Sequence, residues 1–484
     1  MNKKRLLLLA SGAIIITLVA MVCTFALRGS SDAYAHTLPS DANAIVRMDA
    51  KAFLQDADLS LKEIIQLWCR NQQSDDNQQV GIDMQRPIYA FASPSGYFGI
   101  AAAVNDEEDL AAFCKSFQAQ GYVSEAIQQR GYSWVVVAQQ WLLAYDSEKA
   151  LLMGPAVGSS QDQLRGEMAR LLGQKRNNSG LQSSLFAALK KSDEPLAAII
   201  APEILPAPAR KVLRRCKVAS QADALLRLTL QTDDNVLEVG TELLAENEDV
   251  KAEIKHMDEL LRPITGALMD NAHSENVAWM TMNVEGATLL DALRSNQAIR
   301  TALLAMNFAF DLDRIIRAVD GDVTLEITNV TSLLGTIGVD FQLKDIYLAA
   351  EVAHTDFLSN TSTWGSSLFG VQPLTSQDFA LNMGTSSFFF GVEDKTFYFG
   401  SQQGLAHEKN DYLRDQRSDI KDKRFYATFA VPTLVNQLGA KAGLPASVSN
   451  FERFNIQMEH FGDFKLQLLA PPGTNIVREI ILNR

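Results

Sequence analysis

Residues that commonly perform catalysis or bind metals are few in this sequence and are widely spread. The six histidines lie at positions 36, 256, 273, 354, 407 and 460, so no two could share a helix turn as a metal pair does. No stretch matches G-x-S-x-G, G-x-G-x-x-G, H-E-x-x-H or a phosphate-binding P-loop. We therefore predict no catalytic residue, no cofactor and no metal site. The sequence favours a protein that is not an enzyme.

An acidic turn is the nearest approach to a cation site. Asp320 and Asp322 flank Gly321, directly after a helical pattern over residues 310–318. A calcium loop needs further oxygen ligands at alternate positions, but the next alternate residues here are apolar. We interpret this stretch as the end of a helix, a turn and the start of a strand.

Two aromatic runs, FFF at 388–390 and FYF at 397–399, are the most unusual feature of the composition. They flank a short polar turn, so we expect them to pair as a hairpin. One interpretation is a strand buried on both sides. The other is an apolar groove for a lipid or for a partner's strand. The groove would be lined by Phe388, Phe390, Phe397 and Phe399.

The cysteines exclude a disulfide framework and a cysteine-rich zinc site. Cys23 lies in the leader, and Cys69, Cys114 and Cys216 are widely spaced with no C-x-x-C motif. A single disulfide and buried free thiols are both compatible with this spacing. The amphipathic helical patterns around Cys69 and Cys114 favour free thiols.

The charge balance argues against nucleic acid as a partner. The formal net charge is −13; the charged residues before His36 sum to +3, so the remainder carries −16. Such a body repels a polyanion unless a basic patch overrides its field. We interpret the one compact basic cluster as a solvated helix face. It contains Arg210, Lys211, Arg214, Arg215 and Lys217.

The first 35 residues form a membrane signal. Three basic residues at positions 3–5 precede 22 uncharged residues, 6–27. As a helix this apolar run would be about 33 Å long, enough to cross the hydrocarbon core of a bilayer. The basic residues come first, so the N-terminus should stay in the cytoplasm and the body should be exported.

Two fates of this leader remain open. Its length favours a retained anchor, because cleavable signal peptides have shorter apolar cores. However, Ala33-Tyr34-Ala35 matches the A-x-A pattern, which predicts cleavage before His36. The protein is therefore expected in the cell envelope. It would be anchored in the inner membrane with a periplasmic body, or periplasmic or secreted if it is cut after Ala35.

The body is built around a strand that leads into a helix. This pattern occurs at residues 44–54 and returns at 196–205, 277–290 and 425–438. Neighbouring strands are joined by tight turns, which predicts mainly antiparallel sheets. We expect an α+β fold, with a duplicated scaffold, helices packed on one face of the sheets and one membrane-signal helix in front.

We divide the chain accordingly into four segments. They are the leader (1–35), a first α+β half (36–245), a helical connector (246–270) and a second α+β half (271–484). The halves end alike, because the predicted hairpin at 225–244 resembles the one at 454–469.

Three stretches resemble a known family. They are LPSDANAIVRMDAKAFL (38–54), GIDMQRPIYAF (81–91) and VDGDVTLEI (319–327). Together they resemble a domain-of-unknown-function family of uncharacterised Bacteroidetes envelope proteins. That resemblance implies a signal or lipoprotein leader, a long α+β body, an envelope location and no known catalytic residues. The chain departs from the family in lacking a clear lipobox, since Val22 precedes Cys23.

These observations predict an exported, membrane-tethered, non-enzymatic envelope protein that binds a partner or assembles with one. The alternative is a periplasmic carrier of a lipid or other hydrophobic ligand. The expected partners are the membrane, through the N-terminal helix, and an envelope protein or a hydrophobic ligand.

Overall fold

A computed structural model describes most of the chain after the leader. It covers residues 32–56, 80–118, 121–272, 276–295, 297–307, 311–329, 346–359, 361, 365–366, 369–383, 386–403, 411–438 and 446–482. The predicted leader helix and Cys69 lie outside these ranges. Within them, no helix is long and apolar enough to cross a membrane.

The chain forms two compact units. Unit 1 comprises Met1–Val250 together with Gly473–Arg484, and unit 2 comprises Lys251–Pro472. The boundary falls within the predicted connector, where α8 (Glu248–Leu260) is the helix. The C-terminal helix α15 (Ile476–Leu482) belongs to unit 1, where the Ile476 amide donates to the Asp234 carbonyl over 3.0 Å.

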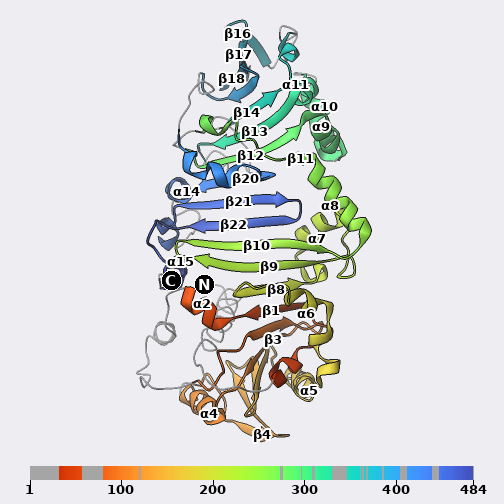
Figure 1. Ribbon diagram of the computed structural model, residues 1–484, viewed down its shortest axis with the longest axis vertical. Coiled ribbons are helices and arrows are strands. Elements are labelled where there is room, and N and C mark those ends of the chain that lie inside the picture. The colour runs from red at the N-terminus through yellow and green to blue at the C-terminus, as the bar shows by residue number, and fades with distance from the viewer. Residues whose placement is uncertain are drawn as a thin grey trace. The chain divides into compact units, whose positions relative to one another are not determined.

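Unit 1 contains one antiparallel array of strands, whose long members are visible in Figure 1. Each strand pairs with the next in the order β4, β5, β6, β7, β3, β2, β1, β8, β9, β10. Their bounds are β1 Ala44–Met48, β2 Ile88–Ala92, β3 Phe98–Ala103, β4 Ile127–Gln129, β5 Tyr132–Val137, β6 Trp141–Tyr145, β7 Lys149–Gly154, β8 Leu196–Ile200, β9 Ala224–Asp233 and β10 Val236–Ala245.

The helices of unit 1 begin where the sequence supplies caps and turn residues. The Asp106 carboxylate accepts hydrogen bonds from the amides of Glu108 and Asp109, which caps the start of α4. The helices, including short 3-10 turns (η), are η1 Asp32–Thr37, α2 Ala50–Asp56, α4 Glu107–Ser116, α5 Ser160–Leu172, η2 Arg176–Asn178, η3 Gly180–Gln182, α6 Ser184–Leu189, η4 Pro202–Ile204 and α7 Ala207–Arg215.

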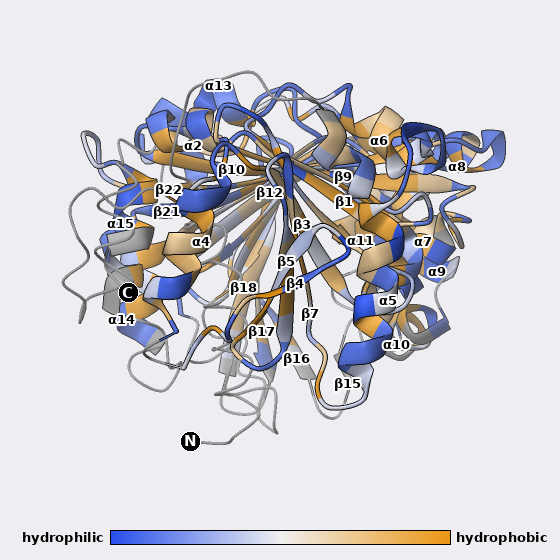
Figure 2. Cartoon of the chain, turned by 90° about the horizontal axis from the view of Figure 1, so that it is seen from below, coloured by the Kyte–Doolittle hydropathy of each residue, from blue (hydrophilic) through white to orange (hydrophobic). Residues whose placement is uncertain are grey.

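Helices cover both faces of the unit 1 sheet, so the prediction that they pack on one face is wrong here. Alternate residues of β7 enter different cores: Leu151 and Met153 pack with α5 and α6, whereas Leu152 packs with α4. Figure 2 shows the same division, with α5 and α6 on one side of the strands and α4 on the other. Because both faces are apolar, the strands need a cover on each side.

Unit 2 repeats the antiparallel pattern. Each strand pairs with the next in the order β15, β16, β17, β18, β19, β14, β13, β12, β20, β21, β22, and short β11 pairs with the end of β12. Their bounds are β11 Leu261–Arg262, β12 Ala278–Glu285, β13 Val319–Ile327, β14 Ile346–Val352, β15 Gly365–Ser366, β16 Phe369–Pro373, β17 Asp378–Met383, β18 Ser386–Glu393, β19 Thr396–Gly400, β20 Phe425–Ala430, β21 Arg453–His460 and β22 Asp463–Leu469.

The two faces of the central unit 2 strands are covered differently. One face packs under α9 and α11, where Leu289 of α9 packs against the cluster of Val284, Val319 and Ala350. The other face packs under irregular segments described below. The helices are α9 Gly286–Ser295, α10 Gln297–Asn307, α11 Leu312–Ala318, α13 Arg417–Ile420 and α14 Val431–Leu438, with short turns η5 Met269–Asn271, η8 Asp356–Leu358, η11 Arg414–Gln416 and η13 Ala446–Asn450.

The α+β class and the mainly antiparallel pairing that we predicted are confirmed. The predicted strand at the start of the body, 44–48, is β1, and the predicted strand 425–430 is β20. Both succeed because an apolar run ends at a helix start within the same short window, so no distant contact is needed to recognise them.

Cys114 and Cys216 are buried free thiols, as the sequence favoured for Cys114. Burial raises the pKa of the Cys114 thiol to about 12. Because the thiolate is the reactive form, we expect Cys114 to resist iodoacetamide at pH 8 in the native protein and to react after denaturation. Peptide mass spectrometry measures the labelled fraction. A Ser95→Cys variant, in an exposed turn, should label in both states; rapid native labelling of Cys114 would contradict its burial.

Candidate functional site

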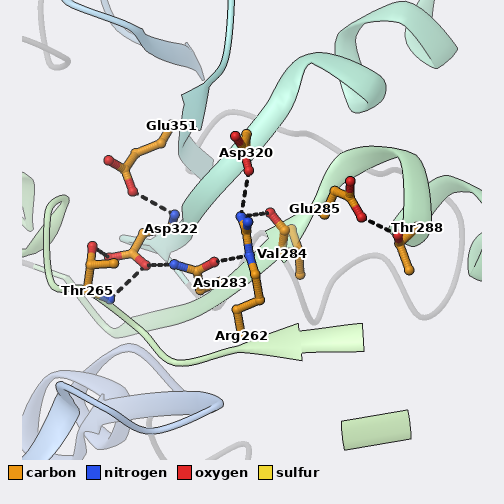
Figure 3. Close-up of polar contacts among 9 residues, drawn as sticks. All are labelled: Arg262, Thr265, Asn283, Val284, Glu285, Thr288, Asp320, Asp322 and Glu351. Carbon is orange, nitrogen blue, oxygen red and sulfur yellow. Dashed lines mark hydrogen bonds and ion pairs between the residues drawn. The ribbon is translucent and has the colours of Figure 1, made fainter. Parts of the chain in front are cut away.

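The most highly connected polar group that the structure describes is the Asp322 carboxylate on β13, only 1% exposed. It accepts five hydrogen bonds. Figure 3 draws the donors Thr265 and Asn283. Three donors are the amides of Thr265 (3.0 Å), Gly266 (2.7 Å) and Ala267 (3.1 Å). The other two are the Thr265 hydroxyl (2.8 Å) and the Asn283 side-chain amide (2.8 Å).

This arrangement stabilises the negative charge of Asp322 and also occupies every lone-pair position of its carboxylate. A carboxylate has about four lone-pair positions, and Oδ1 receives two donors while Oδ2 receives three. A buried charge is tolerated when it is hydrogen-bonded in this way. No lone pair is left for a metal ion or for accepting a substrate proton. Asp322 therefore acts as a structural anchor.

Three neighbouring strands supply a connected row of side chains. In register, Arg262 on β11 faces Asn283 on β12, and Asn283 faces Asp322 on β13. Arg262 Nε donates to Asn283 Oδ1 over 2.9 Å, while Asn283 Nδ2 donates to Asp322 Oδ1. The Arg262 guanidinium also donates to the Val284 carbonyl and pairs with Asp320, both visible in Figure 3. The two neighbours thus fix the orientation of the Asn283 amide.

Gly321 lets a second acid approach the same strand. Its φ is +148°, and a Cβ at this position would lie 2.5 Å from Glu351 Oε2. The Glu351 carboxylate instead accepts a hydrogen bond from the Asp322 amide over 2.8 Å. The expected turn at 320–322 is therefore part of β13, which begins at Val319 directly after α11.

The anchor holds a segment across the sheet. We call residues 263–272 the covering segment. Beside the bonds to Asp322, the Ile264 amide donates to the Lys423 carbonyl, and the Ile264 carbonyl accepts from the Asp422 amide. Ile264 packs with Trp279 and Tyr426, and Leu268 packs with Tyr347.

Polar residues lie on the strand face below the covering segment and are buried with it. Thr281 faces Thr324 in register, and the two are 2% and 3% exposed. Alternation of polar and apolar residues along a strand is typical of an antiparallel sheet with one open face. The structure instead buries this face, because the covering segment and the segment around Leu413 and Ile420 pack on it.

The four phenylalanines proposed to line a groove form a packed core. Phe388, Phe390 and Phe397 are buried, and Phe399 packs against them. All four face one side of the β18–β19 hairpin, because Phe390 opposes Phe399 and Val392 opposes Phe397. The rings stack on one another, with 5.4 Å between the centroids of Phe388 and Phe399 and 5.3 Å between those of Phe379 and Phe390. These side chains fill space against each other, which corrects the groove interpretation.

The cleavage-signal residues lie inside the fold. Ala33, Ala35 and His36 belong to η1, and Tyr34 and Ala35 are buried in a unit 1 core. The Tyr34 hydroxyl donates to the Pro87 carbonyl over 2.8 Å, and its ring stacks on Tyr89.

The acidic turn at 320–322 marks Asp322 in the sequence, but nothing local predicts its partners. Thr265 lies 57 positions earlier and Asn283 lies 39 positions earlier, so no local motif joins them. One local signal was available. A glycine between two acids at the start of a strand indicates a position where a Cβ would collide with a neighbouring group. No group of three or more His, Cys, Asp or Glu residues suited to a metal ion occurs among the residues that the structure describes.

We expect Asp322→Asn to lower the free energy of unfolding of unit 2 by about 3 kcal/mol, because an amide nitrogen would face backbone donors inside the fold. Asp320→Asn is the matched control. Its side chain is half exposed and makes an ion pair with Arg262, so about 0.5 kcal/mol is expected. Urea unfolding followed by hydrogen exchange of unit 2 peptides measures both. Equal effects would contradict the anchor.

Phe390→Ala should lower the free energy of unfolding of unit 2 by about 3–4 kcal/mol, since it removes a buried ring from a stacked cluster. Leu374→Ala is the control. Its side chain is 39% exposed, so it should lower the free energy of unfolding much less than Phe390→Ala does. The same urea titration compares them. A tolerated Phe390→Ala would instead indicate a ring that faces open space.

Comparison with known proteins places the chain in a family. Three solved crystal forms of TP0453 are similar, at 10–11% sequence identity. Form III covers 47% of this chain and 86% of that chain with a TM-score of 0.29, and form I covers 48% and 88% with the same score. These scores are too low to inform fold or function. No curated protein matches.

A family model with the description "Domain of unknown function (DUF4836)" matches residues 34–442. The match includes all three stretches that carried the predicted resemblance, and it confirms that resemblance to a domain of unknown function. It begins at Tyr34, a residue of η1 that is buried in the core. The chain belongs to the family described as Domain of unknown function (DUF4836).

Proposed function

We propose that this chain is an exported envelope protein that stays tethered to the membrane by its leader, and whose body binds or assembles with a partner rather than catalysing a reaction. The leader carries the sequence features of a membrane anchor: basic residues at 3–5, then 22 uncharged residues. The alternative, a body released by cleavage after Ala35, conflicts with the packing at the start of the fold.

That packing is the observation that carries the proposal. Tyr34 and Ala35 are 3% and 4% exposed and belong to the core that α5 and α6 complete. A mature chain starting at His36 would lose the Tyr34 ring, its stacking on Tyr89 and its hydrogen bond to Pro87. Removing a buried aromatic ring costs about 3–5 kcal/mol. Retention of these two residues therefore favours retention of the leader that precedes them.

An exposed sheet edge supports the assembly role. Strand β4 is exposed along its length, and Ile127 on it is 58% exposed. Within the described part of the chain, β4 pairs with β5 alone. An edge strand with free backbone groups and an exposed apolar side chain can accept a strand from a partner.

The other candidate activities receive less support. The hydrophobic carrier needs an apolar cavity, and the phenylalanines that could have lined one pack against each other. An enzymatic role needs a reactive group, and the Asp322 carboxylate is fully occupied by donors.

We also propose that the body arose by internal duplication. In spatial order, unit 1 from its hairpin runs β9, β8, β1, β2, β3, β7, β6, β5, and unit 2 runs β21, β20, β12, β13, β14, β19, β18, β17. With β11 and β15 set aside, the corresponding strands follow one another in the same order along the chain in both units. Helices follow corresponding strands as well: α2 and α9 follow β1 and β12, and α7 and α14 follow β8 and β20.

The mass and N-terminal sequence of the protein recovered from its native membrane fraction test the tether. We expect a chain that begins before Tyr34, keeps the apolar run and resists extraction by high salt and alkaline carbonate. Crosslinking in intact cells then identifies neighbours of the β4 edge. A chain that begins at His36 in the soluble envelope fraction would refute the tether, and would show that Tyr34 is dispensable for the core.

A further inference from the structure

The described side chains of helix α7 are exposed, apart from the half-buried Leu213. Arg210, Lys211 and Arg214 are exposed on it, and none makes an ion pair with another described side chain. Two aliphatic side chains lie among these charges: Val212 is 59% exposed and Ile204, on the preceding turn η4, is 41% exposed. A helix that places apolar side chains in water beside a cluster of cations has the composition of a membrane-surface helix.

The scaffold does not require this composition. In the proposed duplication, α14 of unit 2 occupies the position of α7, and its sequence VPTLVNQL carries no charge. The basic residues of α7 are thus an addition to the fold. They are also opposite in sign to the net charge of the chain, −13. A positive patch on an acidic protein fits an anionic surface.

The start of the body lies on the same side of unit 1 as α7. Tyr34 and Ala35 pack with Leu164 of α5 and Phe186 of α6, and Figures 1 and 2 both place α5, α6 and α7 on one side of the unit 1 strands. The apolar run of the leader ends at Leu27, and η1 begins at Asp32. Four intervening residues reach at most about 18 Å from Leu27 to Asp32.

We propose that α7 and η4 form a second membrane contact, which binds the anionic phospholipid headgroups of the bilayer that holds the leader. Arg210, Lys211 and Arg214 would pair with lipid phosphates, while Val212 and Ile204 would enter the headgroup layer. The inference rests on the proposed tether, because a short linker keeps this side of unit 1 near the bilayer and raises the local concentration of headgroups. The contact should weaken as salt screens it.

The full-length protein, incorporated through its leader, is compared in nanodiscs of phosphatidylcholine alone and of phosphatidylcholine mixed with phosphatidylglycerol. Hydrogen–deuterium exchange is followed in peptides that contain residues 207–215. We expect exchange there to slow by about tenfold in the anionic discs, and high salt should reverse this. The Lys211→Glu/Arg214→Glu variant should abolish the slowing.

The Lys115→Glu/Arg130→Glu variant is the control. It makes the same change in net charge with exposed residues on α4 and beside β4, and it should keep the slowing. Equal exchange of α7 in the two kinds of disc, or equal loss in both variants, would overturn the inference. Failure of the chain to enter discs through its leader would instead overturn the proposed tether, so the two failures are distinguishable.

Discussion

A single saturated carboxylate determines how unit 2 is covered. Asp322 lies on a central strand, and three consecutive backbone amides of the covering segment point at it. An apolar segment gains little free energy by packing on a polar sheet face. The charge-assisted hydrogen bonds to Asp322 hold the covering segment on this face. Ile264 and Leu268 then exclude water from Thr281 and Thr324 below it. Unit 1 needs no such device, because both faces of its sheet are apolar and are covered by packed helices.

The predictions that succeeded concern local patterns. The strand at 44–48 and the antiparallel hairpins follow from alternation and turn residues within a few positions, and burial of Cys114 follows from one amphipathic helix. The predictions that failed required knowledge of distant segments. Thr281 and Thr324 each alternate with apolar residues along their strands, a pattern typical of a solvent-facing sheet. Residues far away in the chain cover them instead. Likewise, the four phenylalanines suggested a groove in the sequence. The strand register, which the sequence does not show, places their rings on one face, where they stack.

Two features of unit 1, far apart in the sequence, support the proposed membrane tether. The first residues of the fold are core residues, so the body cannot be trimmed back far from its leader without losing packing. Helix α7 carries charges that the fold itself does not use. Together they support the proposed tether, in which the body lies a short distance from a bilayer and the exposed edge at β4 can accept the proposed partner.

The path of the chain also constrains when the fold can form. Unit 1 begins at the N-terminus but is completed by α15, whose first amide bonds to the carbonyl of Asp234. All of unit 2 lies between these parts in the sequence. During synthesis, which proceeds from the N-terminus, the last helix of unit 1 therefore becomes available only after unit 2 has been made. A chain truncated before α15 would lack this helix, so its unit 1 would remain incomplete.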